Sequence, residues 1–231
     1  MPEIHSLHPA LRIAGAMLTA MAGCTAPLRA QAQAVQPWPT VLVSGPVADG
    51  VLLSGEATGR IADNSRNSQI ETRFLVGHAF TRHVTGWIGY VHYETYVPNA
   101  RNTHESQVLG QVNWVIGTLG PLHISTRTRL EQRFIGGVDA TSWRWRQQLR
   151  VSVPLGGKTA PSIAVSAEPF IALNETTGQR RTRDQLRTFV GISVPVSPHA
   201  DIEIGYLNQR LYRAGPTLVN NAIPVNLTVH F

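Results

Sequence analysis

The sequence predicts an all-β protein, a transmembrane up-and-down antiparallel β-barrel of about ten strands, with twelve as the alternative. Three observations lead to this fold class: long segments of alternating charged and apolar residues, an export signal at the N-terminus, and a terminal strand ending in an aromatic residue. A mean hydropathy of −0.07 agrees with it, because a helical membrane protein needs runs of about 20 apolar residues.

Alternation with a period of two is clearest in residues 122–134 and 143–155. Their polar positions are His123, Ser125, Arg127, Arg129, Glu131 and Arg133 in the first segment and Arg144, Arg146, Gln148, Arg150 and Ser152 in the second. A β-strand sends successive side chains to opposite faces, so each segment is a strand with one ionic and one apolar face. In a soluble barrel the arginines would meet water, whereas in an outer-membrane barrel the apolar face meets lipid and the arginines fill the interior. The two ends of the chain favour the membrane.

The N-terminus is typical of a secretory signal. Arg12 ends a short polar region, and residues 13–22 are apolar, a run too short to cross a bilayer as a helix. Small residues at positions 30, 32 and 34 suit a signal peptidase. We therefore expect residues 1–34 to be a signal peptide that is cleaved after Ala32 or Ala34.

Cys24, the one cysteine of the chain, leaves an alternative. The segment 21–24 resembles a lipobox, in which the cysteine would be lipidated, although Met21 is unusual at its first position. With conventional cleavage the mature chain has no cysteine, which excludes disulfides and cysteine metal sites. We expect no metal and no cofactor.

The C-terminus resembles the strand by which outer-membrane barrels are recognised by their assembly machinery. Val225, Leu227, Val229 and Phe231 alternate with polar residues. We therefore interpret Phe231 as an assembly signal and the barrel-assembly machinery as a partner. A terminal aromatic residue is weak on its own, but the export signal and the two-faced strands strengthen it.

The high pI of about 10.2 does not indicate a nucleic-acid binder. Many arginines alternate with carboxylates along strands, whereas nucleic-acid binders gather basic residues into an exposed patch. We expect no nucleic-acid partner.

Ten long strands are predicted in residues 50–231, which form the barrel. They lie near 50–61, 68–80, 84–95, 104–117, 120–134, 141–155, 161–173, 185–195, 199–210 and 221–231. Their connections alternate between short and generally longer, as in outer-membrane barrels with short periplasmic turns and longer outside loops. An even number of strands places the start of the first strand and the end of the last strand on the periplasmic side. Residues 35–49 are predicted as a short N-terminal segment, which could be a short pairing segment, an interior insert or half of an additional hairpin.

The alternation gives an inward set of charged residues. The bases are Arg60, Arg73, Arg127, Arg129, Arg133, Arg144, Arg146, Arg150 and Arg187. The acids are Glu56, Glu71, Glu94, Glu105, Glu131, Glu168, Asp201 and Glu203. The register of residues 141–155 is well determined, because turning its arginines toward lipid would cost roughly 2–4 kcal/mol each near the midplane.

This near balance of nine bases and eight acids has three interpretations. Arginine forks can bind carboxylates bidentately and fill a small barrel, so we favour a packed or very narrow interior. A selective pore and a catalytic or binding site are the alternatives. Tyr90, His92 and Glu94 share one predicted inward face and could transfer protons, but such a trio is more often part of a polar interior. With no recognisable catalytic spacing, we expect no enzymatic activity.

Two outer surfaces are also predicted. The aromatic residues on outward parity are Trp87, Tyr93, Trp114, Trp143, Trp145, Tyr206 and Phe231, and several near strand ends are typical of the belts at lipid headgroups. Arg180, Arg181 and Arg183 lie in an outer loop, where they could bind lipopolysaccharide phosphates. The alternative is a solvated loop, or pairing with Glu175 and Asp184.

Four motifs resemble a domain-of-unknown-function family of proteobacterial outer-membrane β-barrels. They are residues 127–133 (RTRLEQR), 143–150 (WRWRQQLR), 168–174 (EPFIALN), and 184–187 (DQLR) followed by 204–209 (IGYLNQ). The resemblance covers most of the mature chain, although Leu186 stands where that family often has Asn. It implies an outer-membrane barrel and no particular activity.

Together these observations predict a barrel in the outer membrane of a Gram-negative bacterium, in contact with membrane lipid and lipopolysaccharide. Its role is structural or that of a narrow, porin-like pore with a charge-paired interior. The alternative is an outer-membrane enzyme or binder that acts on lipid or lipopolysaccharide.

Overall fold

The structure, a computed structural model, describes residues 31–32, 35–62, 67–157, 159–176, 181–212 and 216–231. Strands account for most of them. Within these ranges no helix is long and apolar enough to cross a membrane. The strands are β1 (Gln31–Ala32), β2 (Gln36–Ala48), β3 (Val51–Arg60), β4 (Ser68–Ala79), β5 (Val84–Tyr96), β6 (Thr103–Leu119), β7 (Leu122–Ile135), β8 (Ser142–Pro154), β9 (Ser162–Ala172), β10 (Arg183–Ser197), β11 (Ala200–Leu211) and β12 (Leu218–His230).

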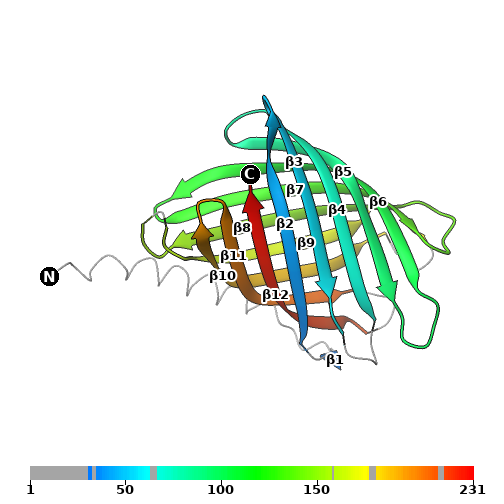
Figure 1. Cartoon of the computed structure of the whole chain (residues 1–231). Helices are drawn as coiled ribbons and strands as arrows, with labels where there is room; N and C mark the ends of the chain where they lie inside the picture. The colour runs from blue at the N-terminus through cyan, green and yellow to red at the C-terminus, as the bar shows by residue number, and fades with distance from the viewer. Residues whose placement is uncertain (1–30, 33–34, 63–66, 158, 177–180, 213–215) are drawn as a thin grey trace.

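Strands β2 to β12 form one closed barrel (Figure 1). Each strand from β2 onward pairs antiparallel with the next, and β12 returns to pair with β2 in parallel, from Ala222 opposite Gln36 to His230 opposite Ser44. The two-residue β1 pairs in parallel with the start of β12. Closure satisfies the backbone groups that an open sheet would leave unpaired at its edges.

The predicted fold class is confirmed, and the observed count of eleven long strands lies between the predicted ten and the alternative twelve. All ten predicted strands are present within a few residues of their expected bounds. The eleventh is β2, which occupies the predicted short N-terminal segment and forms a hairpin with β3 through a turn at Gly50, where φ is +67°. Prolines at 37, 39 and 46 interrupt the strand pattern of this segment in the sequence.

Because the barrel has an odd number of long strands, its first strand begins at one end of the barrel and its last strand finishes at the other. The longer connections (61–67, 97–102, 136–141, 173–182 and 212–217) lie at one end, which we call the long-connection end, and the shorter ones lie at the other, the short-connection end. Because β2 and β12 are parallel, β2 begins at the long-connection end and β12 finishes at the short-connection end. We expected the first and last strands to have their free termini on the same side of the membrane. This expectation is wrong, because the added strand β2 moves the N-terminal start of the barrel to the opposite end. Of the predicted signal peptide, the structure describes only residues 31–32, which form β1. Cys24 lies outside the described residues.

Candidate functional site

The barrel interior contains two groups of ion pairs, and the first joins β3 to β4. Arg60 Nη2 lies 2.9 Å from Glu71 Oε2, and Arg73 Nη1 lies 2.8 Å from Glu56 Oε2. Arg73 also pairs with Glu71 along its own strand. We call these four residues the β3–β4 cluster. Each arginine is held by a carboxylate on the neighbouring strand, as the alternation of charge on each strand predicts.

The second group is larger and centres on Glu131, which is fully buried. Its carboxylate lies 2.6 Å from Arg144, 2.8 Å from Arg146 and 3.7 Å from Arg129. Arg146 continues to Glu168 on β9 at 2.9 Å, and Glu168 also accepts from Arg127 at 3.0 Å. We call this set the β7–β9 cluster; it consists of Arg127, Arg129, Glu131, Arg144, Arg146 and Glu168. Such buried charges tolerate little disturbance, because losing one partner leaves another charge without compensation.

Two aromatic rings stand between the clusters, and Arg187 lies between the rings. The Arg60 guanidinium carbon is 4.8 Å from the centroid of Trp38, and that of Arg187 is 5.6 Å from the same ring. The Arg187 guanidinium carbon is also 4.9 Å from the centroid of Phe170. Arg146, which belongs to the β7–β9 cluster, lies 4.1 Å from the same ring. These distances allow cation–π attraction. The five residues form a row across the barrel, which we call the central row.

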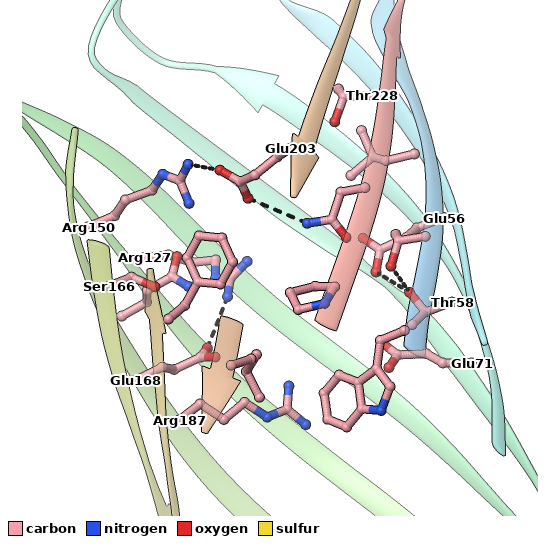
Figure 2. A pocket seen from close by; sticks show the side chains of 18 of the residues that line it. Glu56, Thr58, Glu71, Arg127, Arg150, Ser166, Glu168, Arg187, Glu203 and Thr228 are labelled. Atoms are coloured by element: carbon pink, nitrogen blue, oxygen red, sulfur yellow. Dashed lines mark hydrogen bonds and ion pairs between the residues drawn. The ribbon is translucent and has the colours of Figure 1, made fainter. Parts of the chain in front are cut away.

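Three cavities surround this arrangement. One of about 560 Å³ lies toward the long-connection end, and two of about 490 and 440 Å³ lie toward the short-connection end. The first cavity and the 490 Å³ cavity share Trp38, Arg60 and Arg187 as lining residues. Figure 2 shows the 490 Å³ cavity, with Arg127, Arg150 and Arg187 reaching into it from one wall. Trp38, Arg60 and Arg187 of the central row therefore lie where the cavities from the two ends of the barrel meet.

Most other predicted interior charges lie inside. Arg133 pairs with Glu105 at 2.6 Å, and Arg150 reaches across to Glu203 on β11, two strands beyond its neighbour β9. Asp201 lines the 490 Å³ cavity and faces His230 at 3.4 Å. Asp184, which the sequence placed in an outer loop, lies 3.3 Å from Arg144.

Glu94 does not belong to the interior, and its predicted place is wrong. Tyr93 and Thr95 line the cavity at the long-connection end, so Tyr90, His92 and Glu94 face outward on β5. The interior also has an apolar patch, formed by Leu75, Val91, Tyr93 and Leu109 with Trp87 against it. This patch selects the β5 face, and His92 and Glu94 lie near the end of the strand, where outward charges cost little. Trp87 and Tyr93, predicted to point outward, therefore point inward.

The predicted outer residues divide into three groups. Trp114, Trp143, Tyr206 and Phe231 are exposed on the outer face. Arg181 and Arg183 are exposed beside the start of β10, and Arg183 stacks on Tyr212 at 4.3 Å. Arg180 lies outside the described residues.

The rings of the central row were not predicted as interior residues. Phe170 shares its face with Glu168, two residues earlier on β9, and this alternation could have placed it inside. Trp38 alternates with Gln36 and Thr40, but the neighbouring prolines obscured that pattern.

Comparison with known proteins identifies the family. Residues 35–220 match a family described as "Protein of unknown function (DUF2490)". The chain belongs to this family. An uncharacterized protein of Methylorubrum extorquens is 32% identical over 211 residues, which cover 88% of this chain and 92% of that protein. The resemblance to a proteobacterial outer-membrane barrel family is thereby confirmed.

Among solved structures, LpxR from Salmonella typhimurium is similar to this barrel. The TM-score is 0.51 at 9% identity, over 77% of this chain and 83% of LpxR. At this identity the likeness shows a shared fold alone.

This likeness corrects one expectation from the sequence. We expected no enzymatic activity, but LpxR is an outer-membrane enzyme on the same fold. An outer-membrane-type barrel of this shape is therefore no argument against catalysis, because one fold can hold many different sites.

Proposed function

We propose that this DUF2490 protein is an outer-membrane barrel whose interior is closed midway by ion pairs and by arginines packed on aromatic rings. It acts as a structural barrel or as a narrow pore that admits only small solutes, and not as a wide, open channel. The central row supports the proposal, because it stands between the cavities at the two ends. Barrels of eight strands are filled by their side chains and those of 16 to 18 strands hold a channel; eleven strands lie nearer the filled end of this range.

The outer face supports a location in the membrane. Phe74, Ile88, Val108 and Trp114 are 66%, 69%, 50% and 50% exposed. A soluble protein rarely leaves so wide a band of apolar side chains in water. In a bilayer the same side chains meet lipid. We assign the long-connection end to the cell exterior, on the general pattern of such barrels.

Two measurements test this proposal. The protein should stay with the membrane in alkaline carbonate and migrate faster on a gel unheated than boiled. Reconstituted into planar bilayers, it should conduct far less than a general porin of 16 strands. Release by carbonate would contradict the location, and a porin-like conductance would contradict the closed interior.

The exposed arginines near β10 suit contact with lipopolysaccharide. Guanidinium forks bind phosphate bidentately. Arg181 and Arg183 are exposed at the start of β10, and Arg180 precedes them in the sequence. Asp184, a candidate neutralising partner, is engaged by Arg144. This leaves the exposed arginines more available for an external phosphate.

The test is the gain in thermal stability on adding lipopolysaccharide. Neutralising the three arginines to Gln should reduce this gain, whereas Arg82→Gln, an exposed arginine at the short-connection end, should leave it unchanged. Equal gains in wild type and the triple variant would show that these arginines make no contact.

A further inference from the structure

Arg187 differs from the other eight predicted interior arginines in its partners. Each of those eight has a carboxylate oxygen within 4.0 Å. Within the described ranges, no carboxylate lies within that distance of Arg187. With its amide oxygen turned toward Arg187, Gln209 Oε1 accepts from Arg187 Nε and Nη2 at 3.3 and 3.2 Å. The partner of this cation is thus a neutral amide.

Arg187 lacks a carboxylate partner even though an acidic residue stands next to it on the neighbouring strand. Arg187 stands directly opposite Glu168 in the pairing of β10 with β9. The Glu168 carboxylate is instead taken by Arg146 and Arg127, at 2.9 and 3.0 Å. Because that acid already serves two arginines, the positive charge of Arg187 is left over.

Most of the charged residues that line the cavity toward the long-connection end are basic. Its charged lining residues are Arg60, Arg133, Arg144, Arg187 and Glu105. The remaining polar lining is rich in side-chain amides: Gln36, Asn67, Gln69, Gln107, Gln185, Gln209 and Asn220. Amide NH₂ groups and guanidinium groups both donate hydrogen bonds. Arg60, Arg133 and Arg144 are paired with carboxylates. Arg187 therefore supplies the uncompensated positive charge at this amide-rich wall, which favours an anionic guest.

We propose that this cavity binds a small oxyanion, a phosphate or a carboxylate, with the Arg187 guanidinium at its floor. The planar fork of arginine matches the two oxygens of either group. The rings of Trp38 and Phe170 lie 5.6 and 4.9 Å from the guanidinium carbon. The oxyanion supplies the negative charge that Glu168 does not. Binding does not require the oxyanion to pass through the barrel. The binding site and the closed interior are therefore tested by separate experiments.

Calorimetric titration of the folded full barrel in zwitterionic detergent with inorganic phosphate tests the site, at constant ionic strength set by chloride. Wild type should show saturable binding at one site. Arg187→Gln should weaken it about tenfold or more, as expected for losing a charge-assisted bidentate contact. Arg187→Lys, which keeps the charge without the fork, should fall between the two.

Arg150→Gln is the matched control, because Arg150 lines the neighbouring cavity but pairs with Glu203. It should retain the wild-type affinity. The mobility shift of the unheated protein on a gel shows whether each variant is folded. If Arg187→Gln does not fold, the comparison of Arg187→Lys with wild type decides. No saturable binding by wild type, equal affinity in every folded Arg187 variant, or the same loss in Arg150→Gln would each overturn the proposal.

Discussion

Replacement of Glu131 by alanine should destabilise the barrel strongly. Glu131 is fully buried and its carboxylate serves Arg129, Arg144 and Arg146. After its removal Arg146 keeps Glu168 and Arg144 keeps Asp184. Arg129 has no second carboxylate among the described residues.

The magnitude follows from Arg129. This side chain is 1% exposed and its remaining acceptor is the neutral Gln111 amide oxygen, 2.8 Å from Nε. Leaving one buried charge without its partner costs about 3–5 kcal/mol. We therefore expect Glu131→Ala to lower the free energy of unfolding by about that amount.

The assay is urea unfolding of the barrel in phosphocholine vesicles, followed by tryptophan fluorescence. Asp139→Ala, at an exposed acid between β7 and β8, is the control and should change stability by no more than about 0.5 kcal/mol. Adding Arg129→Met to Glu131→Ala should recover part of the loss, because the uncompensated charge is removed with it. If Glu131→Ala and Asp139→Ala unfold alike, the interior is hydrated and the reasoning from burial is wrong.

Two further predictions concern barrel closure and assembly. Gly45→Ala should destabilise the barrel by about 1–3 kcal/mol, because its new Cβ would lie 2.2 Å from the Phe231 backbone oxygen; Gly110→Ala has nothing within 4 Å of that position and should be nearly neutral. A difference in urea midpoint between these two variants checks this, and equal midpoints would contradict it. Phe231→Asp should lower the amount of assembled protein in the outer membrane while leaving the urea midpoint of protein folded in vitro nearly unchanged, since the Phe231 side chain is largely exposed; normal membrane levels would argue against an assembly signal.

The sequence was most informative where one face of a strand is ionic and the other is apolar. On β7 and β8 a slip of one residue would turn several arginines outward, so the pattern fixes which face points inside. The inward positions of Arg129, Glu131 and Arg146 follow from it, and the structure places them there.

The sequence was less informative where both faces of a strand have mixed character. On β5 the ionisable His92 and Glu94 share one face, whereas Val91 and Tyr93 share the other. The apolar patch contributed by β4 and β6 decides between these faces. On β2, prolines interrupt the sequence pattern, and the pairing with β12 is what makes this segment a strand.

The sequence by itself determined the barrel, ten of its strands and the presence of nearly balanced interior charge. The tertiary structure decided which charges pair. Local alternation fixes the face on which a side chain lies, but several charged groups on neighbouring strands can compete for the same partner. Arg127, which reaches past β8, and Arg146, on the adjacent β8, occupy the carboxylate that stands opposite Arg187. The uncompensated charge of Arg187 therefore arises from competition in three dimensions.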